Sequence, residues 1–184
     1  MSCSVSSAYS LGCKAGVGGV QSLFLFSAPI TGVTYVSGGT DSEEVSVISG
    51  SGNLIEFELY RGGSNFTENM AADPAAGSVV YTQTITALFR DFNTQLRNQF
   101  KLLAKSGSVQ AVVKTNRDEY ILFGVEFGGG DATAINLNSG TAYTDRMGYD
   151  VTLVFNQASP ASFINASTNA QLSSALSGIT LVQA

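Results

Sequence analysis

The stretch that decides the fold is SVVYTQTITALFRDFNTQLRNQFKLLAK, residues 78–105, because the spacing of its apolar side chains changes once along it. In its first part, one set of alternate positions is mostly apolar, and Gln83 is the one polar residue among them. The apolar residues of this set are Val79, Tyr81, Ile85, Ala87 and Phe89. A period of two indicates a β-strand, so we predict a long strand that ends near Arg90.

After Arg90 the apolar residues recur at steps of four, four and three, which is the spacing of one stripe along a helix. The stripe consists of Phe92, Leu96, Phe100 and Leu103. We predict a helix over about 91–105, with Asp91 as its N-cap residue and Gly107 as its left-handed C-cap. Because the stripe must pack on something apolar, we expect the helix to flank a sheet.

Short apolar runs bounded by turn residues predict further strands. These are residues 21–26, 33–36, 45–49, 54–60, 109–114, 119–127, 133–138 and 149–155. Residues 50–52 (Gly-Ser-Gly) are expected to join one hairpin and the polar residues 115–118 another. Near the C-terminus we predict a short helix over 169–176 and an edge strand over 179–182. The resulting fold class is mainly β, an antiparallel β-sandwich or barrel with one flanking helix.

The length of 184 residues suits one domain that buries a single core. Residues 1–19 are small, polar and aperiodic, which predicts a flexible or partner-ordered N-terminal arm. Residues 20–164 form the predicted β domain, and residues 165–184 a C-terminal extension. Residues 61–77 show little β periodicity and are read as a long loop, a kind of segment that is often functional. Its candidate subunit-interface residues are Asn65, Phe66, Met70 and Asp73.

The charge balance argues against binding of duplex nucleic acid, because the chain carries a net charge of −5. Charged residues make up only 12% of the chain, well below the roughly 25% of ordinary soluble chains. A surface so poor in charge is often covered by partners. Six of the nine basic residues crowd into residues 90–117, where the simplest explanation is a solvated helix face and a hairpin turn.

The residues of the common catalytic and metal sites are missing. The chain has no histidine, which removes the usual general base of serine and cysteine hydrolases and the commonest metal ligand. Cys3 and Cys13 alone make a poor zinc site, and Glu56 and Glu58 alternate along a strand without a loop that would support calcium binding or acid–base chemistry. We therefore expect no enzyme activity and no cofactor. No apolar run approaches the roughly 20 residues of a membrane-spanning helix, so no membrane partner is expected.

From Leu11 to Phe163 the order of several short motifs resembles the tail tube proteins of tailed phages, whose fold is shared with the tube of type VI secretion systems. The motifs before the predicted helix are Cys13-Lys14, Gly18-Gly19-Val20, Tyr60-Arg61-Gly62-Gly63, Phe66-Thr67-Glu68-Asn69 and Tyr81-Thr82-Gln83-Thr84. The later ones are Leu102-Leu103-Ala104-Lys105, Asp118-Glu119-Tyr120, Phe123-Gly124, Ser139-Gly140-Thr141-Ala142, Asp145 and Gly148-Tyr149.

This resemblance implies a subunit that assembles with itself as hexameric rings, which stack into a hollow conduit for DNA. The expected partners are other copies, other phage tail proteins and DNA that passes without specific binding. The expected location is the tail of the virion, after assembly in the host cytoplasm. Six copies would carry 6 × −5 = −30 per ring, and an acidic or neutral lumen would let DNA slide. The lumen-facing candidates are polar positions of long strands: Glu56, Glu58, Thr82, Thr84 and Thr86.

Two other functions stay open at this stage. One is another virion structural protein with a β-sandwich fold. The other is a monomeric β-sandwich module, either an adhesin or a carbohydrate-binding domain, although the chain has no tryptophan and no export signal.

Overall fold

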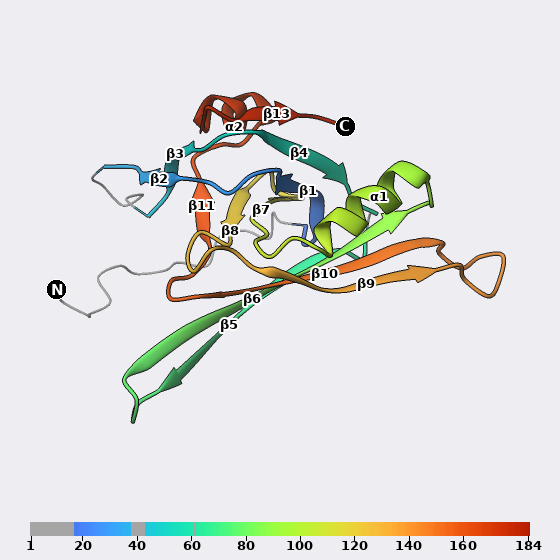
Figure 1. The fold of residues 1–184 in the computed structure, drawn as a ribbon, viewed down its shortest axis with the longest axis horizontal. Coiled ribbons are helices and arrows are strands. Elements are labelled where there is room, and N and C mark those ends of the chain that lie inside the picture. Colours follow the sequence, from blue (N-terminus) through green and yellow to red (C-terminus); the bar gives the residue numbers. More distant parts are fainter. Residues whose placement is uncertain (1–16, 38–42, 61) are drawn as a thin grey trace.

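The computed structural model describes residues 17–37, 43–60 and 62–184. The predicted N-terminal arm therefore lies almost entirely outside the described residues. Within these described residues, thirteen strands form two sheets that lie one on the other, and two helices flank them (Figure 1). The predicted mainly β sandwich fold is confirmed.

The smaller sheet has four strands, all antiparallel. Their order across the sheet is β5 (Asn65–Asp73), β6 (Ser78–Arg90), β10 (Gly148–Gln157) and β9 (Asp131–Asn138). The predicted long strand before the helix is β6, which pairs with β10 over ten residues, from Arg90↔Gly148 to Tyr81↔Gln157. This strand is the centre of the smaller sheet.

The larger sheet has nine strands and curls on itself. Its order is β12 (Leu176–Ser177), β3 (Val45–Ser49), β11 (Ser162–Ile164), β8 (Tyr120–Phe123), β7 (Ala111–Thr115), β1 (Val20–Phe26), β4 (Asn53–Glu58) and β13 (Thr180–Val182), with β2 (Gly32–Tyr35) paired to β3. The predicted hairpin of β7 and β8 is present, and Asp118 in its turn has a left-handed backbone. Each face of this sheet covers apolar side chains, so two clusters form.

The first cluster lies between the two sheets and includes Leu23, Ile85, Phe123 and Phe155. The second lies inside the curl of the larger sheet, where Phe24, Ile48 and Leu122 are fully buried. Alternate residues of β1 serve the two clusters, since Leu23 and Leu25 face the smaller sheet while Phe24 faces the curl. A strand buried on both sides reads as a continuous apolar run, as residues 23–26 do.

The predicted hairpin over residues 50–52 is wrong, because β3 and β4 do not pair with each other. Two short C-terminal strands lie between them instead: β12 pairs in parallel with β3, and β13 pairs in parallel with β4. Gly178 links these two strands with φ +76°, and a Cβ there would lie 2.5 Å from the Gly50 carbonyl oxygen. Helix α2 (Asn169–Ala175) buries Leu172 and Ala175 in the second cluster, so residues 165–184 supply part of the core.

The predicted helix is present as α1 (Thr94–Leu103), but both predicted caps are wrong. Asn93 is the N-cap, and its side chain accepts a hydrogen bond of 2.6 Å from the Leu96 amide. Asp91 instead takes a left-handed backbone, φ 85°, and its carboxylate bonds the next amide. At the other end Ala104 is the C-cap in a right-handed conformation, and Gly107 is not left-handed.

The apolar stripe packs as predicted, with three of its four residues in the helix and the Phe92 ring, just before it, 6.2 Å from the ring of Tyr149. The Phe100 ring lies 4.9 Å from the rings of both Phe89 and Tyr149, and Leu96 and Leu103 pack against the same cluster. Phe92 precedes the N-cap and is 37% exposed. Helix α1 therefore closes one side of the space between the two sheets (Figure 1).

The long loop predicted over 61–77 is mostly a strand. Residues 65–73 form β5, which pairs with β6 in unbroken register from Asn65↔Thr86 to Asp73↔Ser78. The pattern of β5 gave little sign of a strand because nearly all of its residues are exposed. The predicted inward face of β6 is also only half right: its residues are buried from Gln83 to Phe89, but Val79 is exposed.

Candidate functional site: the outer face of the four-stranded sheet

The outer face of the smaller sheet is covered by small polar side chains. The inner residues of β6 alternate with Thr82, Thr84 and Thr86, which point away from the core and are half-buried by their neighbours. The strand register places similar residues beside them. This polar face consists of Asn65, Thr67 and Asn69 on β5, Thr82, Thr84, Thr86, Leu88 and Arg90 on β6, Asp150, Thr152, Val154 and Asn156 on β10, and Asp131, Ala134, Asn136 and Asn138 on β9.

The polar face has few charges. Its charged residues are Asp131, Asp150 and, at the end of the outward row of β6, Arg90 opposite Gly148. Arg146 forms an ion pair with Asp150 and donates a hydrogen bond of 3.2 Å to the Phe89 carbonyl oxygen. A surface of threonine, asparagine and alanine, with Arg90 at its end and Arg146 paired to Asp150, offers few cations for ion pairing with a phosphate chain.

Both edges of this sheet lack a partner within the described part of the chain. β5 pairs only with β6, and β9 pairs only with β10. An edge strand presents unpaired backbone N–H and C=O groups that can pair with another strand. The polar face therefore lies between two edges that are able to extend it.

One end of the sheet continues as a free hairpin. β6 pairs with β10 as far as Tyr81, and beyond that residue β5 is its one neighbour. The ribbon runs on for three further residue pairs, from Ala71↔Val80 to Asp73↔Ser78, which is roughly 10 Å before the turn. We call residues 71–80 the hairpin tip, and Figure 1 shows it projecting from the body of the molecule.

A buried polar contact marks the point where the hairpin leaves the body. The Gln83 side chain is 1% exposed, and its amide donates a hydrogen bond of 2.9 Å to the Glu68 carboxylate. The same carboxylate oxygen accepts a hydrogen bond of 2.7 Å from the Ala161 amide. The side-chain oxygen of Gln83 has no partner among the described residues. Glu68 and Gln83 thus fasten the base of the hairpin to the loop after β10.

The lumen-facing candidates divide between two distant surfaces. Thr82, Thr84 and Thr86 lie together on the polar face. Glu56 and Glu58 lie on β4, on the side of the larger sheet that faces away from the smaller one, at the mouth of the curl. The structure therefore does not place the two glutamates on the same wall as the three threonines.

At the mouth of the curl, the open end of the larger sheet next to Glu56 and Glu58, polar side chains form a network of hydrogen bonds. Glu56 accepts a hydrogen bond of 3.3 Å from Asn169, whose oxygen accepts one from the Tyr120 hydroxyl. Burial raises the pKa of Tyr120. Burial lowers the pKa of Lys114, but the ion pair of its ammonium group with Asp118 and its contact with Tyr120 raise the pKa by more. The net effect is a raised pKa for Lys114. These contacts tie α2 and the β7–β8 turn to the sheet, which is a structural task.

The four interface candidates also separate. Met70 is 59% exposed where the ribbon leaves the body, and Asp73 lies in the hairpin tip. Asn65 lies on the polar face beside Thr86. Phe66 packs its ring 5.5 Å from the ring of Phe123, so its apolar character is explained by a contact within the chain.

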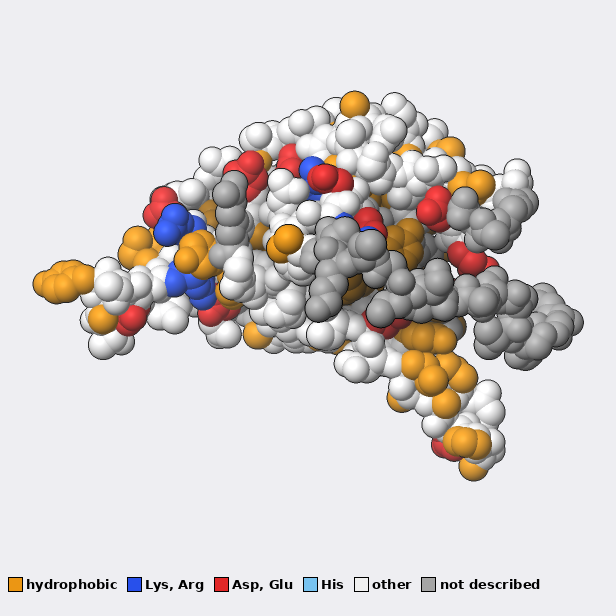
Figure 2. Space-filling model, turned by 180° about the vertical axis from the view of Figure 1, so that it is seen from behind, with side chains coloured by type: hydrophobic (Ala, Val, Ile, Leu, Met, Phe, Trp, Pro, Cys, Tyr) orange, Lys and Arg blue, Asp and Glu red, His pale blue; other side chains and the backbone are white. Residues whose placement is uncertain are grey.

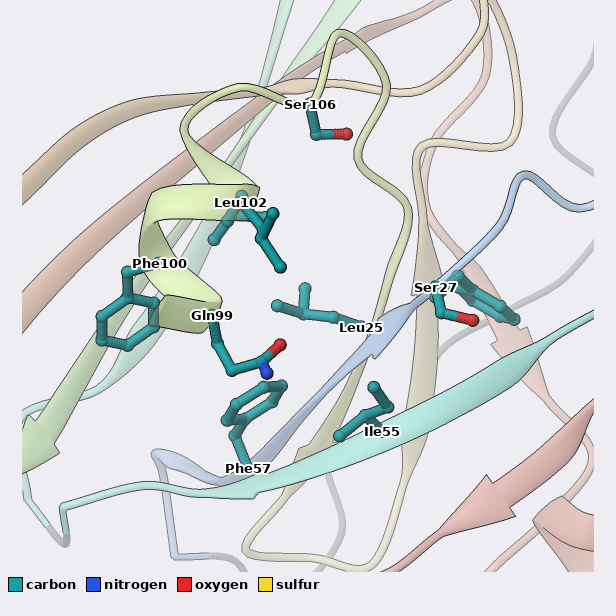
Figure 3. A pocket seen from close by; sticks show the side chains of 10 residues that line it. Leu25, Ser27, Ile55, Phe57, Gln99, Phe100, Leu102 and Ser106 are labelled. Atoms are coloured by element: carbon teal, nitrogen blue, oxygen red, sulfur yellow. The ribbon is translucent and has the colours of Figure 1, made fainter. Parts of the chain in front are cut away.

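Sequence analysis overlooked half of the polar face, which comes from β9 and β10. The signal was present, because Asp150, Thr152 and Asn156 alternate with apolar residues in β10. It also overlooked a groove between α1 and the larger sheet, of about 290 Å³ (Figure 3). The residues that line this groove come from three separated segments, so no local pattern indicates it.

Among the described residues there is no cluster of three or more histidine, cysteine or acidic residues suited to a metal ion. The helices of the described segments are all too short or too polar to cross a membrane. Comparisons of the chain with family models, with curated proteins and with solved structures gave no match.

Proposed function

We propose that this chain is the tail tube subunit of a tailed phage, which joins copies of itself into rings that stack as a conduit for DNA. The observation that carries the proposal is the polar face, a broad and nearly uncharged surface between two unpaired strand edges. Rotation about one axis would bring the β5 edge of each copy to the β9 edge of the next. A head-to-tail contact of this kind closes into a ring when the rotation closes.

The chemistry of the polar face suits an inner wall. Each phosphate that a basic wall neutralised would release counterions and add affinity, which would have to be broken as DNA moves. Threonine and asparagine offer hydrogen bonds that water can replace, and Asp131 repels phosphate, while Arg146 balances the charge of Asp150. In this arrangement Thr82, Thr84 and Thr86 line the lumen, while Glu56 and Glu58 lie on the opposite side of the subunit.

The proposal is tested by electron microscopy of the purified full-length chain and by DNA binding across a range of salt concentrations. We expect rings or tubes that bind duplex DNA weakly at all salt concentrations. A chain that sediments only as a 19.2 kDa monomer would favour a binding module, and tight salt-sensitive DNA binding would contradict a neutral lumen.

A matched pair of variants tests which surface faces the lumen. Thr84→Lys adds a cation at the centre of the polar face, and we expect assembled rings of this variant to retain DNA at low salt and release it as salt rises. Ser173→Lys adds the same charge on the exposed side of α2, far from that face, and should leave DNA binding unchanged. Equal effects of the two variants would remove the polar face from the lumen.

A further inference from the structure

The groove beside α1 is apolar and open to solvent. Leu102 of α1 and Leu25 of β1 converge on the same space, and Ile55 and Phe57 of β4 lie along its other side (Figure 3). Leu102 is 64% exposed although it belongs to the lining. The volume, about 290 Å³, is close to the lower end of ligand pockets, so it suits a few apolar side chains.

The exposed side of α1 is strongly basic. Arg97 and Lys101 are four residues apart in α1, which places them on one face, and Lys105 follows two residues after its last residue; all three are exposed. None of them takes part in an ion pair among the described residues. Lys101 is next to Phe100 and Leu102 in the chain, and Lys105 is next to Ser106; these three neighbours line the groove, so the two lysines lie beside it. An apolar groove edged by cations fits an occupant with apolar side chains and negative charge.

The hairpin tip combines apolar side chains with a negative charge. Its residues are all exposed, and Figure 2 shows hydrophobic side chains gathered along the projecting hairpin. Ala72 and Val79 lie on one side of the ribbon and Ala71 and Val80 on the other, so both sides are apolar. From residue 64 to residue 89 the charged residues are Glu68 and Asp73, with no lysine or arginine. A two-stranded ribbon is marginally stable alone in water, which favours a partner that covers it.

The hairpin tip cannot reach the groove of its own chain, because α1 and the tip lie at opposite ends of the molecule (Figure 1). We propose that the tip of one copy docks in the α1 groove of a second copy, with Val79 in the groove and Asp73 near the lysines. This contact rests on the proposed tube function and names the partner of the hairpin. It is head-to-tail, so it propagates from copy to copy and does not stop at a dimer.

Cross-linking of single-cysteine variants tests the contact. In the full-length chain with Cys3→Ser and Cys13→Ser, Val79→Cys and Leu102→Cys are made separately, mixed and oxidised mildly. We expect a disulfide between positions 79 and 102, identified by peptide mass spectrometry. The matched control pairs Val79→Cys with Tyr143→Cys, a fully exposed residue of the β9–β10 loop, and should give little of the mixed product.

Charge reversal gives a second measurement that does not depend on cysteine. Lys101→Glu with Lys105→Glu should raise the protein concentration needed for assembly by roughly two- to fivefold, as should Asp73→Lys. Combining the two sets should recover part of the loss.

The outcomes separate this contact from the proposed function. Rings or tubes that form without the 79–102 disulfide would overturn the contact and leave the tube function standing, whereas the disulfide without tubes would support the contact and count against the tube. If Leu102→Cys in the otherwise natural chain forms an intramolecular disulfide with Cys3 or Cys13, the N-terminal segment occupies the groove and the proposal is wrong. A chain that remains monomeric and uncross-linked overturns both.

Discussion

The two halves of β6 belong to one strand and have very different surroundings. From Gln83 to Phe89 the strand lies between β5 and β10, and alternate side chains are buried in the first cluster. From Ser78 to Val80 the strand has β5 as its one neighbour, and all of its residues are exposed. The sequence changes little across this boundary, because both halves are rich in β-branched residues. The β-branched residues therefore account for the length of β6. Only the residues from Gln83 to Phe89 are also stabilised by burial in the first cluster.

The difference separates the part of β6 that the fold stabilises from the part that the proposed contact between copies would cover. Residues with few buried contacts open with small free energies, and binding surfaces are commonly drawn from them. The part of β6 from Gln83 to Phe89 governs the stability of the monomer. The part from Ser78 to Val80 belongs to the proposed contact between copies. Substitutions on either side of Tyr81 are expected to separate the two properties.

The largest expected effect comes from shortening one apolar side chain in each half. Ile85 is fully buried, so Ile85→Ala should lower the free energy of unfolding by about 2–5 kcal/mol. Val79 is 46% exposed, so Val79→Ala should change it by no more than about 0.5 kcal/mol. Urea unfolding followed by circular dichroism, at concentrations where the protein is monomeric, measures both.

The same two variants should reverse their order in an assembly assay. Val79→Ala removes part of the surface that the proposed contact between copies would cover, so tube formation should require more protein. If Val79→Ala destabilised the monomer as much as Ile85→Ala, the hairpin tip would be held by its own chain, and the comparison would fail.

A smaller effect is expected at the boundary, where Glu68 fastens the hairpin. Glu68→Ala removes the main partner of the buried Gln83 amide and the acceptor of the Ala161 amide. Leaving a buried donor unpaired costs about 1–3 kcal/mol, so the free energy of unfolding should fall by about that amount. Asn69→Ala, one residue further along and exposed, is the matched control and should be nearly neutral. Equal losses in the two variants would mean that the Glu68 contact contributes nothing specific.

The elements predictable from sequence are those whose side chains divide between core and solvent. The inner half of β6 and the stripe of α1 show clear periods because Ile85, Phe89 and Phe100 are buried beside exposed neighbours. β5 was not predicted because both of its faces are exposed, so its apolar and polar residues need not alternate. The caps of α1 were misplaced because Asp91 satisfies its own local turn, which left Asn93 as the N-cap.

Only those residues of the polar face that lie on one strand, β6, could be predicted from the sequence. The threonines of β6 were found by alternation, but their neighbours on β9 and β10 depend on register, which one strand does not reveal. The separation of Glu56 from these threonines depends on which sheet each strand joins. The C-terminal strands β12 and β13 each pair with a distant strand through two or three residues, so no local pattern predicts that they keep β3 and β4 apart.

The smallest expected effect lies at the opposite end of the sheet, in the β9–β10 loop, which holds its own shape. The Asp145 carboxylate accepts hydrogen bonds from the amides of Ala142, at 2.7 Å, and Thr141, at 2.8 Å. These two bonds favour the charged form and hold the pKa of Asp145 below its ordinary value of 3.8. Because the folded pKa is the lower one, the loop contacts contribute fully above the unfolded pKa and are lost as pH falls through the folded pKa. Carboxyl-carbon NMR should show Asp145 titrating below pH 3.8, with the Thr141 and Ala142 amide shifts following it, and Asp145→Asn should abolish that movement. A carboxylate that titrates at or above its ordinary value would mean that this loop, like the hairpin tip, depends on a neighbouring copy for its shape.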